Sequence, residues 1–395
     1  MSELPEAPMS KAAIALNRFG YGQRIRGSQP SDPVRDLLDQ MDRYNPNPSQ
    51  LAGREDTSAK AGEFLQQLRR LRRERQNAAA SSGMSEMQEM QRGMTRNPEL
   101  DGLPPEIRNS YLSSGQILRR DVGLRTNIAV QSDTPMLERL VHFWSNHFSV
   151  SAQRPGTHHQ VGNHEFRAIR PHVLGKFSDM LKAATLHPAM LLYLDQFQSI
   201  GPNSQFQRRR RQRGNRGNGQ GQDRGLNENL AREILELHTL GVGGGYDQSD
   251  VTEFARALTG WTIQGLARVA RFAKAQPTGA AFISVAHEPG TRTIMGRTYR
   301  DNGSKQAVAI LDDLAAHPST ARFIATKFAR HFVGDTPPES LVAKLEADFR
   351  KTSGDLASLT RTLIEAPEAW VSEPVKFRAP FEWLVAVLRM TGVEN

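Results

Sequence analysis

The sequence predicts a mainly α-helical protein, built as a single large multi-helix domain with at most one or two short β-hairpins. Apolar residues recur at helical spacing through most of the 395 residues. Only residues 269–285 and 292–299 resemble strands, and both stretches are short. We find no internal repeat of fixed period, so a solenoid is not indicated. With 38% hydrophobic residues, the chain can bury a substantial core.

The composition excludes several classes of protein. The absence of Cys rules out disulfides, thiolate nucleophiles and cysteine metal sites, so any metal would need His, Asp or Glu ligands. No run of about 18 apolar residues is present to form a transmembrane helix, which predicts a soluble protein. The N-terminus carries acidic residues where a signal peptide would be basic, so a cytoplasmic location is expected. Export is the alternative if a signal has been lost from the N-terminus.

The net charge of +9 comes from two local segments. Residues 208–224 hold seven Arg and one Asp, which supply +6, and residues 69–75 hold five Arg and one Glu, which supply +4. The rest of the chain is therefore nearly neutral. The Arg, Gly, Asn and Gln composition predicts a disordered basic loop over residues 207–225. The part of this loop from Arg208 to Arg224 is a candidate for an accessory contact with nucleic acid or another anionic partner.

In the first half of the chain, turn and capping signals separate the expected helices. Ser31-Asp32-Pro33 and Asp133-Thr134-Pro135 are typical helix starts, and the His187-Pro188 pair marks a boundary. Residues 54–100 are expected to form a helical arm inserted into the domain, because apolar residues fall at helical spacing among Arg and Glu. The helices are expected over residues 12–16, 32–41, 58–76, 121–130, 135–150, 164–169, 173–185 and 188–194.

In the second half, Gly241 and Gly260 are expected to end two helices, and Pro, Gly and Asp separate four more. These helices are expected over residues 227–240, 250–259, 305–315, 319–332, 338–353 and 356–365.

The segment around His142 is the richest in chemical groups. In a helix, His142 shares a face with Glu138 and Asn146, whereas His147 lies about 140° away, so the two histidines are not a co-facial metal pair. His142 is a candidate ligand or general base with Asn146 beside it. The alternative is a packing helix in which Trp144 is buried and His142 only satisfies a hydrogen bond.

A second helix places Asn229, Glu233 and Glu236 on one stripe. Two carboxylates three residues apart and facing inward would favour a metal or acid/base chemistry, because their repulsion raises one pKa or requires a cation. Alternatively, Arg232 and the helix ends neutralise them.

Glu253 and Arg256, also three residues apart, are interpreted first as an ion pair that fixes helix packing and second as a catalytic couple. Trp261 is expected either to line a pocket or, more commonly, to end a helix in the core. His287 lies beside Glu288 on a predicted turn, which makes it a further site candidate.

Common enzyme fingerprints are absent. The sequence has no Walker glycine loop, dinucleotide fingerprint, Gly-x-Ser-x-Gly elbow or His-Glu-x-x-His motif.

Taken together, the motifs resemble the domain-of-unknown-function 1800 family of bacterial, mostly helical proteins. The matching segments occur in the family's order and are residues 12–22 (AAIALNRFGYG), 139–148 (RLVHFWSNHF), 187–195 (HPAMLLYLD), 227–242 (NENLAREILELHTLGV), 250–261 (DVTEFARALTGW), 287–296 (HEPGTRTIMG) and 374–389.

The resemblance implies a shared polar site without naming a reaction. It places His142, Trp144, Asn146, His147, Glu233, Glu236, Glu253, Arg256, Trp261 and His287 on family motifs. Two features depart from the family. Glu288 follows His287 where relatives more usually have Asp, and the Gly-Trp-rich motif expected near the C-terminus is not present. Many relatives carry export signals, so a secreted or envelope role is an alternative.

The leading hypothesis is an enzyme with a buried His/Glu site between helices, which could hold a divalent metal for hydrolytic or oxidative chemistry. His142, Glu233 and Glu236 are the candidate metal ligands, with His287 as a possible fourth. Trp144 and Trp261 are candidates for binding a cofactor. The alternative is a helical scaffold that docks a protein or other partner, with the basic loop binding an anionic one. The candidate catalytic residues are His142, Asn146, Glu233, Glu253, Arg256 and His287.

Overall fold

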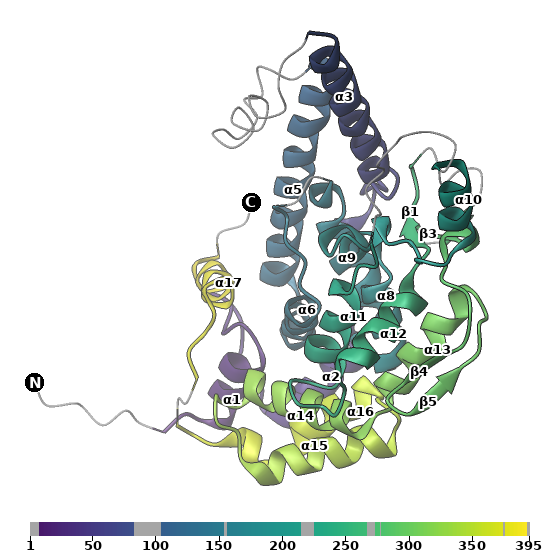
Figure 1. Cartoon of the computed structure of the whole chain (residues 1–395). Coiled ribbons are helices and arrows are strands. Elements are labelled where there is room, and N and C mark those ends of the chain that lie inside the picture. Colours follow the sequence, from purple (N-terminus) through teal and green to yellow (C-terminus); the bar gives the residue numbers. More distant parts are fainter. Residues whose placement is uncertain are drawn as a thin grey trace, which may run out of the picture.

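A computed structural model of the chain confirms the mainly α-helical fold with a few short antiparallel strands (Figure 1). It describes residues 8–82, 104–153, 156–214, 225–266, 273–276, 278–373 and 376–392. Among them, no helix combines the length and apolar character needed to cross a bilayer.

The first part of the chain contains the two longest helices. The Asp32 side chain caps the helix α2 (Pro33–Arg43) by accepting a hydrogen bond from the Arg35 N–H, as the sequence predicts. The helices α3 and α5 pack against each other and extend beyond the rest of the molecule in Figure 1. Residues 83–100 of the predicted arm lie outside the described part of the chain, and α5 begins much earlier than the predicted residue 121. The elements are α1 (Lys11–Ile14), η1 (Ala15–Phe19), α2 (Pro33–Arg43), η2 (Ser49–Leu51), α3 (Lys60–Ser82), α5 (Pro105–Gln131) and α6 (Pro135–His147).

The middle of the chain is a series of short helical segments. Three stretches of the molecule, η1, η5 and η8, are π-helical, so their side chains do not follow the 3.6-residue spacing. The elements are η4 (Thr157–His159), α7 (Val161–Asn163), η5 (His164–Ile169), η6 (Arg170–His172), α8 (Phe177–Thr185), α9 (Pro188–Tyr193), η7 (Gln196–Gln198), α10 (Gln205–Gly214), α11 (Asn229–Glu233), η8 (Ile234–Thr239) and α12 (Gln248–Leu258).

The strands form two small sheets. In the first, β3 (Ala280–Ile283) lies between β1 (Trp261–Ile263) and β2 (Ala273–Ala275), with Trp261 opposite Phe282. The second is the predicted hairpin of β4 (Arg292–Ile294) and β5 (Arg297–Tyr299). The first sheet has one more strand than a hairpin because the segment after α12 pairs with β3. Trp261 therefore begins a strand and does not end a helix, which corrects the expectation from the sequence.

The last third of the chain is helical again. The helices α14 and α15 pack together, and α15 packs on α16. The elements are η9 (Ser284–Ala286), α13 (Ser304–Ala315), α14 (Pro318–Phe332), α15 (Glu339–Lys351), α16 (Leu356–Glu365), η10 (Pro367–Trp370) and α17 (Pro380–Thr391).

The helix α10 includes the first part of the segment predicted as a disordered loop over residues 207–225. Residues 205–214 form the helix α10, because Arg and Gln are good helix formers and no glycine interrupts them before Gly214. Gln207 is 2% exposed and anchors the helix to the body. Residues 215–224 lie outside the described part of the chain.

At the centre of the molecule, α6 is buried on every side. Nine consecutive residues, from Met136 to Trp144, are buried. Glu138 lies among them and accepts two hydrogen bonds from Arg170, at 2.7 and 2.9 Å. Since Arg170 is only 1% exposed, the two charges neutralise each other inside the core. The carboxylate of Glu138 raises the pKa of Arg170 in spite of its burial.

Buried histidines are unusually frequent. Burial lowers the pKa of ten histidines. The pKa of His164 falls to about 4 and that of His238 to about 3. His187 and His317 each precede a proline, and each Nδ1 accepts a backbone N–H at 3.1 Å as the N-cap of a helix. Protonation of Nδ1 would remove these two caps.

The fold should therefore lose stability in mild acid. Between the ordinary histidine pKa near 6.5 and the lowered folded values, the unfolded chain binds more protons than the folded chain. Each fully buried histidine then costs about 1.4 kcal/mol per pH unit below pH 6.5. Urea denaturation should show a free energy of unfolding that is constant from pH 7.5 to 8.5 and falls by several kcal/mol by pH 5.5. An equally stable protein at pH 5.5 would contradict this account.

Removing the charge of Glu138 should destabilise the fold strongly. In Glu138→Gln, Arg170 remains buried without a counter-ion, which costs about 3 to 5 kcal/mol. The matched control is Glu339→Gln, because Glu339 also binds an arginine, Arg322, but is 73% exposed. Its loss should be below about 1 kcal/mol. Urea denaturation of both variants measures the difference, and similar losses would show that the buried pair is not special.

Candidate functional site

A cationic pocket lies where three parts of the chain meet. They are the N-terminal motif (residues 12–22), the helix α6 and the C-terminal segment (residues 376–382). Its cavity measures about 290 Å³. Four cations and one carboxylate take part in its lining, together with two phenylalanines. The lining residues are Met9, Asn17, Arg18, Arg139, Phe332, Lys376, Phe377, Arg378 and Glu382.

The π-helical turn η1 places Asn17 and Arg18 in this pocket. The Gly20 N–H donates to the Ala15 carbonyl five residues back, at 3.1 Å, which widens the turn and leaves Arg18 and Phe19 buried. Arg18 then reaches the C-terminal segment. Its Nη1 donates to the Ala369 carbonyl at 2.7 Å and its Nη2 to the Glu373 carbonyl at 3.0 Å.

Arg139 of α6 forms a buried wall of the pocket. Its Nε and Nη2 donate to Oε1 of Glu382 in α17, at 3.3 and 3.0 Å, and its Nη1 donates to the Arg18 carbonyl. The guanidinium lies over the Phe332 ring, 5.2 Å from its centre. His331 Nε2 is 3.6 Å from the same oxygen of Glu382. Glu382 is thus already engaged by Arg139.

The other two cations come from the segment before α17. Arg378 Nη2 donates to the side-chain and backbone oxygens of Asn17, at 2.7 and 3.2 Å. Lys376 Nζ donates to the Arg330 carbonyl, and the nearest carboxylate oxygen, on Asp335, is 3.7 Å away. Asp335 is 87% exposed, so water weakens this pair.

These contacts leave positive charge uncompensated in the pocket. Arg18 and Arg378 bind carbonyl or amide oxygens and form no ion pair within the described residues. Burial lowers the pKa of Arg18, Lys376 and Arg378, and the carboxylates of Glu373, Asp335 and Glu382 offset this effect only in part. Arg170 behaves in the opposite way because Glu138 neutralises it. An anion in the pocket would supply the missing compensation.

Apolar side chains are exposed at one lining residue of the pocket and along α17. Phe377 is 95% exposed, and α17 exposes Trp383, Leu384 and Met390. The two charged residues of α17, Glu382 and Arg389, are both buried. A ligand at the pocket can therefore contact charge and apolar surface together.

His142 lies one turn after Arg139 but outside this lining. Its Nδ1 is hydrogen-bonded to the hydroxyl of the fully buried Tyr21, and the Phe381 ring packs edge-on at 4.6 Å. Burial, with a smaller effect from Arg125, lowers the pKa of His142 well below its ordinary value. A neutral packing role fits this environment.

The other candidates on α6 do not join His142. Asn146 is exposed, so it is not a buried partner. Trp144 is fully buried among Phe143, Phe148 and Phe177. The His147 Nε2–H donates to the His238 carbonyl at 3.1 Å.

Glu233 and Glu236 do not face inward as predicted, because both are half-exposed. The π-helical turn η8 begins at Ile234 and breaks the assumed stripe between them. Burial and then Glu236 raise the pKa of Glu233. Among the described residues, no three His, Asp or Glu side chains are placed to hold a metal ion. His142, Glu233 and Glu236 are thus not gathered into one ligand group.

Glu253 and Arg256 are paired, and the pair includes a third residue. Arg292 of β4 donates to Oε2 of Glu253 at 3.1 Å, while Arg256 binds Oε1. These contacts connect α12 with the hairpin, which is the structural role expected first from the sequence.

His287 and Glu288 point to different partners. The His287 Nδ1–H donates to the Thr259 carbonyl at 2.9 Å, and its Nε2 is 3.8 Å from Asp301. Glu288 is buried and accepts the backbone and side-chain N–H groups of Asn203, both at 2.7 Å. These contacts tie the turn to neighbouring loops.

Trp261 packs against the Phe282 ring, 5.6 Å away, and is only 5% exposed. Neither Trp261 nor Trp144 lines the cationic pocket or a second cavity of the molecule, which is described next.

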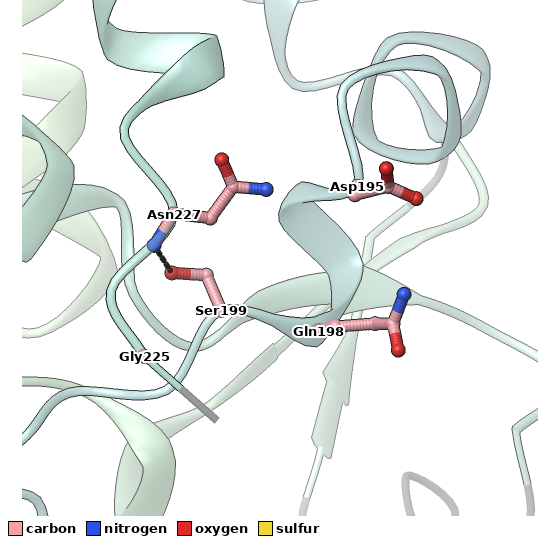
Figure 2. A pocket seen from close by; sticks show the side chains of 5 residues that line it. All are labelled: Asp195, Gln198, Ser199, Gly225 and Asn227. Atoms are coloured by element: carbon pink, nitrogen blue, oxygen red, sulfur yellow. Dashed lines mark hydrogen bonds between the residues drawn. The ribbon is translucent and has the colours of Figure 1, made fainter. Parts of the chain in front are cut away.

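That second cavity, of about 240 Å³, lies beside η7 (Figure 2). Ser199 Oγ accepts the Asn227 N–H at 3.2 Å, and the Asn227 side chain donates to the Leu194 carbonyl at 2.8 Å. Because the lining carries little charge, the cavity resembles a packing gap more than a site for an ion. It is lined by Asp195, Gln198, Ser199, Gly225 and Asn227.

Sequence reasoning missed the four cations of the pocket. Arg18, Arg139 and Arg378 all lie on segments that carry the family resemblance. The site predicted from the sequence is instead based on His and Glu residues as metal ligands. A signal was available, because these motifs hold arginine beside aromatic and glycine residues in Arg18-Phe19-Gly20 and Phe377-Arg378.

The comparisons with known proteins give a family and no activity. No curated protein and no solved structure matches the chain. One family profile, described as "Protein of unknown function (DUF1800)", matches residues 14–395. Since the match extends over nearly the whole chain, including every wall of the cationic pocket except Met9, the protein belongs to the DUF1800 family.

Proposed function

We propose that the protein binds a small organic anion in the cationic pocket. The observation that carries the proposal is that Arg18 and Arg378 are held by carbonyl and amide oxygens instead of carboxylates. The buried Arg18 guanidinium has no ion-pair partner among the described residues, and a ligand carboxylate or phosphate would offset the cost of its burial with charge-assisted hydrogen bonds.

The balance of charges favours a dianion. Arg139 and Glu382 neutralise each other, which leaves Arg18, Lys376 and Arg378 to face the ligand. Phosphate monoesters and dicarboxylates carry two negative charges in a compact group. Phe332 and Phe377 supply apolar contacts, which favour an organic ligand over inorganic phosphate.

Binding is better supported than catalysis. Glu382 is the one carboxylate in the lining, and it is engaged by Arg139 and by the Ala379 N–H, at 3.3 Å, at the start of α17. The metal-dependent hydrolytic or oxidative enzyme expected from the sequence would need its candidate ligands in one place. A scaffold role is compatible with the proposal if the anionic group belongs to a partner protein.

Isothermal titration calorimetry with phenyl phosphate, succinate, butyrate and inorganic phosphate tests the proposal. We expect the two organic dianions to bind more tightly than butyrate or phosphate. Arg378→Gln should weaken binding about tenfold or more, because it removes a charge-assisted contact of about 1.5 to 3 kcal/mol.

The matched control is Arg35→Gln, which removes the same charge from an arginine that is 77% exposed and outside the pocket. It should change affinity less than twofold. Absence of measurable heat with all four compounds, or an equal loss in both variants, would sink the proposal.

A further inference from the structure

The helix α10 presents a second cationic feature, which is separate from the pocket. Gln207 is buried on the side that packs against η9, and the Ser204 carbonyl accepts the Arg208 N–H at 3.0 Å in the first turn. Arg208, Arg209 and Arg211 are exposed. The fold thus holds the helix on the surface with its arginines directed outward.

Among the described residues, these three arginines have no acidic partner. The helix contains no Asp or Glu, and within the described residues Arg208, Arg209 and Arg211 form no ion pair. Some exposed arginines elsewhere do pair, as Arg322 does with Glu339 and Glu346, so what distinguishes α10 is that three unpaired arginines lie on one short helix. The positive potential of α10 is therefore available to an external anion.

The spacing of the arginines fits an extended anion better than a small one. Residues three apart on a helix have Cβ atoms about 5 to 6 Å apart, so Arg208 and Arg211 project side by side, with Arg209 about 100° away. The two cavities described above are not lined by α10. A ligand must supply several negative charges along its length, as nucleic acids and anionic membranes do.

The composition of the helix separates these two kinds of ligand. A helix that lies in a membrane surface needs an apolar face, and the only large apolar side chain of α10 is Phe206. Phe206 is 36% exposed, which offers one aromatic ring to an unpaired base. We propose that α10 is a contact site for single-stranded nucleic acid, with Arg208, Arg209 and Arg211 on phosphates and Phe206 on a base.

Fluorescence anisotropy with a labelled 20-nucleotide oligothymidylate tests this site in the full chain. The variant Arg208→Gln/Arg209→Gln/Arg211→Gln should bind at least fivefold more weakly at low salt. The slope of log affinity against log salt should fall by about 2, because three phosphate contacts release about 0.7 counter-ions each on single strands.

The matched control is Arg35→Gln/Arg300→Gln/Arg361→Gln, which removes the same charge from exposed arginines outside α10. It should change affinity less than twofold. Phe206→Ala should weaken binding to the single strand and leave a duplex of the same length unaffected. Far-ultraviolet circular dichroism confirms that each variant is folded.

Three results would overturn the assignment. The first is no binding by the wild-type chain at 50 mM salt, and the second is an equal loss in both triple variants. The third is binding to phosphatidylglycerol vesicles that is lost in the α10 variant while oligothymidylate binding persists, which would assign the helix to a membrane surface.

Discussion

The fold depends on how α6 is buried. Because every side of this helix faces the interior from Met136 to Trp144, its charged and polar residues must find partners on other elements. Glu138 forms an ion pair with Arg170, and Arg139 forms one with Glu382. His142 is hydrogen-bonded to Tyr21. Each partner comes from a different segment, so these contacts fix where the N-terminal motif, η6 and α17 sit around α6. An apolar helix would pack as well but would not select those positions so specifically.

The cationic pocket is a consequence of the same network. Arg139 holds the Arg18 carbonyl on one side and Glu382 on the other, so it sets the distance between η1 and α17. Arg18 and Arg378 then connect η1 with the segment that precedes α17, through carbonyl and amide oxygens. The groups that shape the pocket are therefore also groups that stabilise the fold. Substitutions at the buried Arg139 would confuse binding with stability, whereas Arg378 is half-exposed and separates them.

The sequence predicts the helices well where apolar spacing and capping act together. Residues 356–365 are helical as expected, because Asp355 caps a regular apolar stripe. Prediction from the sequence fails where the backbone departs from the 3.6-residue period, as it does at η8. The angular position calculated for Glu236 on a regular helix is then wrong. Prediction from the sequence also fails at the pocket. The Arg18 contacts to residues more than 350 positions away use backbone carbonyls, which every residue has, so no sequence pattern marks them.

The C-terminal helix α17 reverses the usual distribution of side chains. Glu382 and Arg389 are buried, and Arg389 Nη1 donates to the carbonyls of Ala129, Val130 and Ser132 at the end of α5. Val385 is the one apolar residue of the helix that is fully buried. Polar contacts and a small apolar cluster around Val385 and Phe381 therefore attach α17, and Trp383, Leu384 and Met390 remain exposed. Since apolar surface of this kind usually marks an interaction site, a ligand with an anionic group and an apolar portion would use both features at once. Such a ligand would also join η1 to the segment before α17, because Arg18 belongs to the first and Arg378 to the second.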